Sequence, residues 1–204
     1  MMKTLKRRVP LLIAAVFSLL AVAGGDGLAA DSAPYHRTND EFLRQWQWPE
    51  RSRLAAQAMI EKYGLPTRTN ESELVWYNNG PWLRTVVHRE SWRGFLGTRD
   101  NDIVDQAIAY RVTADERKAL ERFSKRIVVD EAAGELISRS ESENLNFLAL
   151  NLAGEIAGGM RTVKDALKFF ARTEELSKAG KSSAYLERFV FPVGGGIGGE
   201  VGSD

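Results

Sequence analysis

The chain has 204 residues, of which 28 are Lys or Arg, 27 are Asp or Glu and two are His, while Cys is absent. A net charge of only +1 argues against the strongly basic surface of a nucleic-acid-binding protein, and a chain without Cys has neither disulfides nor a lipid-modified cysteine anchor. Because the two His lie far apart in sequence and no Cys can assist them, we expect no metal site and no cofactor.

Residues 1–30 have the pattern of a secretory signal peptide. Four basic residues lie within the first eight positions, an apolar run covers residues 11–23, and small residues occupy positions 28–30. The apolar run is too short for a comfortable membrane span and no later stretch is long enough, so we expect no transmembrane span after signal cleavage. Cleavage near Asp31 would leave 24 basic and 26 acidic residues, and we predict a periplasmic or secreted protein that does not bind nucleic acid.

The rest of the chain is long enough for one domain with a substantial core. We expect an N-terminal arm over residues 31–48, a single domain over residues 49–180, and a Gly-rich, largely disordered tail over residues 181–204. Six of the last eleven residues are Gly, which favours disorder. The apolar patch at residues 186–193 is expected either to dock on the domain or to bind a partner.

The first predicted elements are a helix and a hairpin. The helix begins at Pro49, because Pro is favoured at the first helical position, and runs to about Tyr63, after which Gly64 stops it. Residues 74–77 and 82–87 are rich in β-branched and aromatic side chains and predict two strands joined by a tight turn.

This turn and its flanks provide the ligand-binding candidates, which are Asn78, Asn79, Trp82 and Arg84. Asn tolerates the backbone conformations of a tight turn. Trp76 and Trp82, if exposed together, would form an aromatic platform, and the alternative is that both pack in the core or at its rim.

The second strand of the hairpin provides the catalytic candidates, His88 and Glu90. Successive side chains of a strand face opposite ways, so Arg84, His88 and Glu90 share one face. One hypothesis is a polar groove or an acid/base pair formed by His88 and Glu90. The alternative is a half-exposed strand whose charges pair with a neighbouring strand, which is the commoner arrangement.

An alternating pattern predicts a third strand over residues 103–112. Gln106 interrupts its apolar face and is interpreted as a hydrogen-bonded core amide, with a ligand contact as the alternative. Thr113 followed by Glu116 is a capping box that opens a helix to about residue 125. Residues 127–130 and 135–138 then predict a second hairpin.

Residues 143–157 predict the central core helix, because apolar side chains follow helical spacing around most of its girth. Asn144 and Asn151 lie seven residues apart on one side of it. We interpret both as side chains that bond to neighbouring backbone, since a buried amide needs partners, and a ligand contact is the alternative. A last helix over residues 163–178 is expected to bury Leu167.

Together these elements predict an α+β fold. The expected architecture is an antiparallel sheet of about five strands with helices packed mainly on one face.

Three segments carry motifs that resemble one known family. They are EKYGLP (61–66), LVWYNNGPWLRTVVHRE (74–90) and NFLALNLAGEI (146–156). The combination of YGxP, W-x-NNGPW and NFLALNLA resembles a family of uncharacterised exported bacterial proteins, over most of the chain that follows the leader. Leu83 departs from the family pattern, which usually has Lys there. The resemblance implies export but no particular activity.

Two functional hypotheses remain open. The first is a non-enzymatic binding or envelope-associated protein, with a periplasmic protein or a small molecule as its partner. The chain contains no P-loop and no G-x-S-x-G motif, which favours this hypothesis. The second is a hydrolase in which His88 is the base and Glu90 or Asp105 orients it.

Overall fold

A computed structural model describes residue 43 and residues 47–91 and 102–193. The expected signal peptide, most of the N-terminal arm and residues 194–204 lie outside this part of the chain. The described elements are helix α2 (Glu50–Tyr63), strands β1 (Arg68–Thr69), β2 (Glu73–Asn79), β3 (Trp82–His88) and β4 (Val104–Ala109), helix α3 (Ala114–Phe123), strands β5 (Ile127–Asp130) and β6 (Glu135–Ser140), and helices α4 (Glu143–Ala157), α5 (Val163–Lys178) and α6 (Ala184–Glu187).

The strands form one open antiparallel sheet in the order β1-β2-β3-β4-β6-β5, so the predicted α+β fold is confirmed. The sheet has six strands and not five, because Arg68 and Thr69 pair with Val75 and Leu74 to add a two-residue edge strand. Two polar residues carry no periodic pattern, so this strand could not be read from the sequence.

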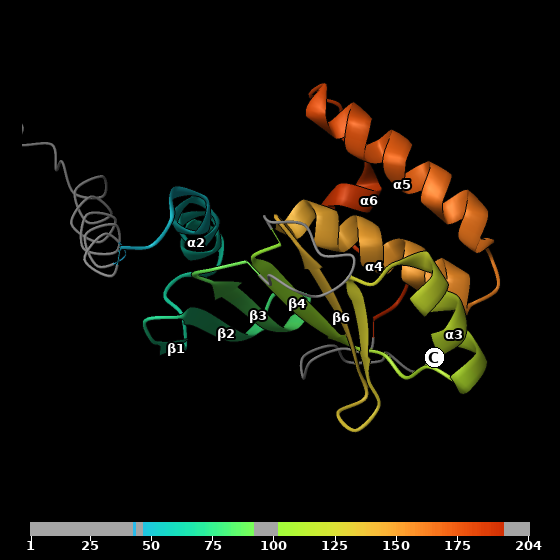
Figure 1. Cartoon of the computed structure of the whole chain (residues 1–204), viewed down its shortest axis with the longest axis horizontal. Coiled ribbons are helices and arrows are strands. Elements are labelled where there is room, and N and C mark those ends of the chain that lie inside the picture. The colour runs from blue at the N-terminus through green and yellow to red at the C-terminus, as the bar shows by residue number, and fades with distance from the viewer. Residues whose placement is uncertain (1–42, 44–46, 92–101, 194–204) are drawn as a thin grey trace, which may run out of the picture.

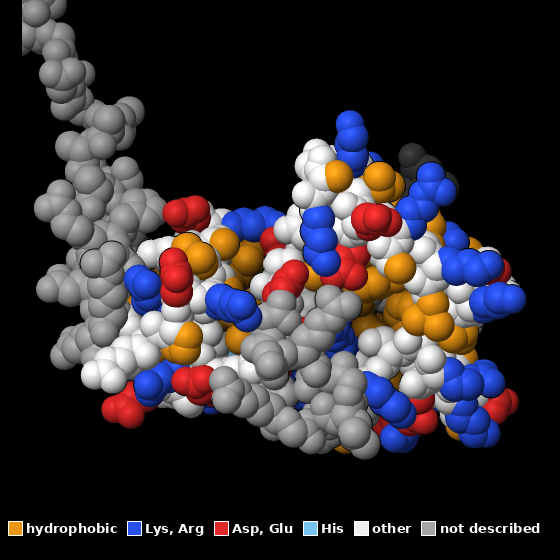
Figure 2. Space-filling model, turned by 45° about the horizontal axis from the view of Figure 1, so that its top comes forward, with side chains coloured by type: hydrophobic (Ala, Val, Ile, Leu, Met, Phe, Trp, Pro, Cys, Tyr) orange, Lys and Arg blue, Asp and Glu red, His pale blue; other side chains and the backbone are white. Residues whose placement is uncertain are grey.

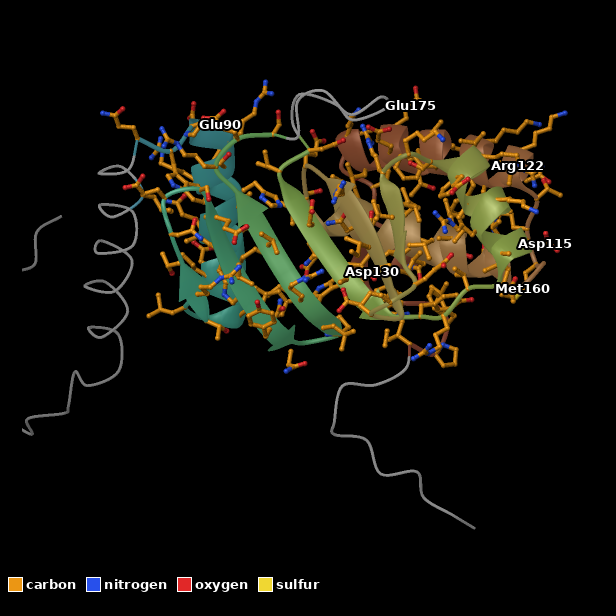
Figure 3. The ribbon with its side chains drawn as sticks, turned by 60° about the horizontal axis from the view of Figure 1, so that its bottom comes forward. Glu90, Asp115, Arg122, Asp130, Met160 and Glu175 are labelled. Atoms are coloured by element: carbon orange, nitrogen blue, oxygen red, sulfur yellow. The ribbon has the colours of Figure 1, made fainter. Side chains whose placement is uncertain are left out.

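The helices lie on one face of the sheet (Figure 1). Helix α2 covers the end of the sheet that contains β2 and β3, helix α4 covers the other end, and α3 and α5 pack on α4. Figure 3 looks onto the opposite face of the sheet, with the helices behind it. None of the helices in the described ranges has both the length and the apolar character that a membrane crossing requires.

Helix α4 is the centre of the larger hydrophobic cluster, as predicted from its apolar girth. Leu148, Leu150 and Leu152 project from different sides of α4, yet all three are completely buried. The sheet covers one side of α4, and helices α3 and α5 cover the other. A second cluster joins α2 to the sheet through Met59, Ile60 and neighbouring side chains of β2 to β4.

The N-terminal arm contributes to this second cluster. Leu43 is completely buried, and Trp48 is nearly so and donates a hydrogen bond of 3.1 Å from its indole Nε1 to the carbonyl oxygen of Glu71. At least these two positions of the expected arm therefore belong to the folded domain.

The apolar patch at residues 186–193 docks on the domain. Phe189 lies 5.0 Å from Phe147 between ring centroids, and the ring of Phe191 fills the space beside Gly154, where a Cβ atom would come within 2.8 Å of it. The largely disordered tail was expected to begin at residue 181, and this finding corrects that boundary. The aromatic side chains of residues 184–193 pack this segment against α4, although the Gly-rich composition of the tail concealed this in the sequence.

Candidate functional site

The face of the sheet opposite the helices carries a row of charged side chains. The His88 Nε2 atom lies 3.4 Å from Asp105 Oδ2, and the Arg139 Nε atom lies 3.1 Å from the same oxygen. Arg84 pairs with Glu135 at 3.0 Å. All of these partners come from the neighbouring strands β4 and β6, which is the arrangement expected of a strand that pairs its charges across the sheet.

The predicted pair of His88 and Glu90 is corrected, because β3 ends at His88. The chain then leaves the sheet, and Ser52 Oγ of α2 donates a hydrogen bond of 2.7 Å to the carbonyl oxygen of Arg89. Glu90 is exposed at the end of the sheet (Figure 3), with its Oε1 atom 3.8 Å from Arg89 Nε. The carboxylate that contacts His88 is that of Asp105, the second orienting residue suggested by the sequence.

The four predicted ligand-binding residues do not share a surface. Trp82 is 1% exposed and Asn79 is buried, both on the helix side of the sheet. Arg84 is on the opposite face, and Asn78 is exposed with a φ of 52° at the end of the hairpin. The left-handed backbone at Asn78 breaks the simple alternation of β2 at the turn, which explains why neighbouring side chains of the turn and its flanks do not share one surface.

Trp82 belongs to a buried polar cluster around Glu143, the first residue of α4. Glu143 Oε1 accepts hydrogen bonds from the Tyr63 hydroxyl at 2.5 Å, the Trp82 indole at 2.7 Å and the Gln106 amide at 3.2 Å. Its other oxygen pairs with the Lys62 ammonium. A buried carboxylate is costly unless it is hydrogen-bonded and paired, and here both conditions are met.

The cluster extends across the sheet through Gln106. Its amide also donates to Thr85 Oγ1 at 3.2 Å, and Thr85 Oγ1 accepts a second hydrogen bond of 2.9 Å from Asn79. Asn146 of α4 donates to the Gln106 side-chain oxygen at 3.0 Å and to the Val104 carbonyl oxygen at 3.1 Å. Gln106 is therefore the hydrogen-bonded core amide that its position in the strand predicted.

Burial raises the pKa of the Tyr63 phenol well above its ordinary value, and the hydrogen bond to the Glu143 carboxylate raises it further. Tyr63 is therefore a neutral hydrogen-bond donor at physiological pH. The cluster joins α2, the first hairpin and α4, and the Tyr63, Trp82 and Gln106 donors all bond to Glu143. We conclude that it holds these elements together.

The same region explains why the YGLP and NNGPW segments occur together. Trp76 donates a hydrogen bond of 2.9 Å from its indole Nε1 to the carbonyl oxygen of Gly64. Gly80 has a φ of 64°, and a Cβ atom on it would lie 3.0 Å from the Tyr63 ring. The end of α2 and the tip of the hairpin are thus in direct contact.

A pocket of about 340 Å³ opens where α3, α4, α5 and the β5–β6 hairpin meet. It lies within the range of small-molecule sites, whose volumes are roughly 300–1,000 Å³. The face in Figure 2 shows hydrophobic side chains at the surface beneath α5, with Lys and Arg side chains around them. The apolar part of the pocket lining consists of Phe123, Leu145, Ala149, Leu167 and Phe170.

The prediction that Leu167 is buried is wrong, because this side chain is 47% exposed. Helix α5 lies outside α4, and the apolar stripe of α5 borders the pocket. The pocket itself was not predicted, since its walls come from segments far apart in sequence. The sequence signal for the pocket is that the apolar stripe of α5 is longer than the part of this helix that contacts the core.

Within the described ranges, no group of three or more His, Asp or Glu side chains is placed to hold a metal ion. No protein-family model, curated protein or solved structure matches the chain. The resemblance to a family of exported proteins therefore stays a prediction, and the function is argued from the geometry.

Proposed function

We propose that the protein is a non-enzymatic binding or envelope-associated protein, exported to the periplasm or beyond, and that it holds a small molecule in the pocket between α3, α4 and α5. The observation that carries this proposal is the pocket, a concave space lined by apolar side chains of three helices and by a smaller number of polar residues. Binding sites for small molecules commonly combine these two features.

The apolar walls of the pocket come from three helices that pack on one another, which supports a binding role. Phe123 ends α3, Leu145 lies in the first turn of α4 and Phe170 is in the middle of α5. The rings of Phe123 and Phe170 contact each other with centroids 6.5 Å apart, so the walls are held in place by packing. A preformed pocket binds without the entropic cost of ordering its walls.

Native mass spectrometry of the protein, isolated from the compartment to which it is exported, tests the binding role. Leu167 and Leu176 are similarly exposed on α5, at 47% and 43%, but only Leu167 lines the pocket. We expect a bound small molecule on the wild type and on Leu176→Asp, and little or none on Leu167→Asp. A wild type without any bound molecule, or equal occupancy in both variants, would count against the proposal.

Export is tested on the same samples. Processing near Asp31 should be visible as the N-terminal residue of the purified protein, and the leader pattern over residues 1–30 is the basis for this expectation. An unprocessed chain that stays in the cytoplasm would contradict it.

The alternative function, a hydrolase that uses His88, is favoured by one observation. His88 Nε2 lies 3.4 Å from Asp105 Oδ2, so a carboxylate is in position to orient the imidazole. Arg139 contacts the same oxygen and weakens this hypothesis, because it offers the carboxylate a permanent cationic partner. Hydrolysis of a p-nitrophenyl ester that is lost in His88→Ala and retained in Leu167→Asp would favour the enzyme.

A further inference from the structure

We infer that the pocket selects a ligand with an anionic group attached to an apolar body, such as an aliphatic carboxylate. This inference rests on the proposed binding function and adds the chemical class of the ligand. It follows from the way in which charge and apolar surface are divided within the pocket lining.

The apolar part of the lining can accept a hydrocarbon body. Leu145 and Ala149 are one turn apart on α4, and both are more than nine-tenths buried beside the pocket. Phe170 and the half-exposed Leu167 face them from α5. Covering these side chains with a hydrocarbon would remove apolar surface from water, which favours binding.

The polar part of the lining contains cations and no carboxylate. It includes Lys125 and Arg126 together with Ser124 and Ser140, while the Arg139 guanidinium points to the opposite face of the sheet, where it pairs with Asp105. Both arginines are paired with carboxylates, since Arg126 Nε lies 2.9 Å from Asp102 Oδ2 and Arg139 Nε lies 3.1 Å from Asp105 Oδ2. Each of these two pairs is neutral as a whole.

Lys125 is different, because it is exposed and no ion pair links it to another residue of the described ranges. It follows Ser124, the residue after α3, at the mouth of the pocket. Among the described lining residues, the cation without a carboxylate partner is therefore Lys125. A ligand with its hydrocarbon on Leu145 and Ala149 and its anionic group at Lys125 would satisfy both parts of the lining.

Three probes with the same ten-carbon chain separate charge from apolar burial, namely decanoate, decanol and decylammonium. We expect calorimetric titration of the purified protein to give the tightest binding for decanoate, weaker binding for decanol and the weakest for decylammonium. Lys125→Gln should weaken decanoate binding about threefold, the effect of one solvent-exposed ion pair, and leave decanol unchanged. Lys118→Gln, an exposed change on α3 outside the pocket lining, is the matched control.

The binding position is tested with the two α5 variants. Leu167→Asp should abolish decanoate binding, whereas Leu176→Asp should bind like the wild type. Because both leucines are exposed, both variants should keep the melting temperature of the wild type within a few degrees, so a loss of binding reports the pocket and not unfolding.

The outcomes distinguish the ligand class from the proposed function. Equal affinity for decanoate and decanol, or unchanged decanoate affinity in Lys125→Gln, would overturn the anionic class while the binding role stands. Failure of all three probes to bind would also overturn the anionic ligand class. If native mass spectrometry nevertheless shows a molecule that is retained by the wild type and lost in Leu167→Asp, the pocket binds a ligand of another chemical class.

Discussion

The indole Nε1 of Trp82 donates a hydrogen bond of 2.7 Å to Oε1 of Glu143, which lies 61 residues later in the chain. Both groups are buried, one at the start of β3 and the other at the start of α4. The contact fixes the first hairpin to the central helix through a charged acceptor, and such hydrogen bonds are stronger than those between neutral groups.

Removal of the Glu143 carboxylate should therefore destabilise the fold. Glu143→Leu would leave the Trp82, Tyr63 and Gln106 donors buried without their acceptor, and we expect the free energy of unfolding to fall by about 3–5 kcal/mol. Glu143→Gln keeps an acceptor oxygen and should lose about 1–3 kcal/mol. Urea denaturation measures both values, and Glu175→Gln, an exposed change on α5 (Figure 3), should have almost no effect. A Glu143→Leu protein as stable as this control would show that the cluster contributes little.

Gly80→Ala should destabilise the protein by more than its backbone conformation alone requires. Both Gly80 and Gly159 have positive φ values, of 64° and 70°, but only at Gly80 would a Cβ atom meet another side chain, the Tyr63 ring at 3.0 Å. Each substitution should cost about 1–2 kcal/mol for the left-handed backbone. Since the Tyr63 hydroxyl is bound to Glu143, the ring cannot move away, and overpacking should add about 1 kcal/mol at Gly80. Equal losses in the two variants would argue against a tight contact between α2 and the hairpin.

The raised pKa of Tyr63 predicts a dependence of stability on alkaline pH. The unfolded chain loses the phenolic proton near pH 10, whereas the folded chain keeps it to higher pH, because burial and Glu143 disfavour the phenolate. The stabilisation is fully present below pH 10 and is lost as the pH rises towards the folded-state pKa. The wild type should thus lose stability above pH 10 more steeply than Tyr63→Phe in urea denaturation.

Tyr110 and Tyr185, whose pKa values are also raised by burial, are present in both proteins and cancel in this comparison. Tyr77→Phe, a change of an exposed side chain, should follow the wild type. Parallel pH profiles of the wild type and Tyr63→Phe would contradict the role assigned to the phenol.

Asn151 is expected to hold the C-terminal segment on α4. Its amide donates to the carbonyl oxygens of Tyr185 at 3.2 Å and Arg188 at 2.8 Å, and its oxygen accepts from the Val190 amide at 2.9 Å. Asn151→Ala should lower the free energy of unfolding by about 2–3 kcal/mol and increase hydrogen exchange at the Val190 amide. Asn144→Ala, at an exposed position on the same helix, should change neither quantity. Unchanged protection of Val190 in Asn151→Ala would contradict the assignment.

Local patterns predicted most of the elements. The bounds of α4 and α5 agree with those expected, because helical spacing of apolar residues and the Thr162 cap mark them clearly. The capping box at Thr113 is present with both of its hydrogen bonds. Asn151 bonds to backbone as expected, whereas Asn144, interpreted in the same way, is exposed on the outer side of α4.

The Glu143 cluster could not be predicted in the same way. An acidic residue in the first turn of a helix is usually explained by the helix dipole, so nothing marked its carboxylate as buried. The partners are 80 or 61 residues away from it, at Tyr63 and Trp82. One usable signal was that the polar groups of buried Trp and Tyr side chains need hydrogen-bond acceptors. An acidic residue at the start of the apolar helix α4 could have been considered as such an acceptor.

The docking of residues 184–193 also bears on the order in which the domain assembles. Phe189 contacts both Trp82 and Phe147, and Phe191 contacts Phe189, so one ring cluster joins the first hairpin, α4 and the C-terminal segment. These rings lie far apart in sequence, and contacts between distant segments are slow to form because a long loop must first be closed. The cover of the central helix is therefore expected to close late in folding.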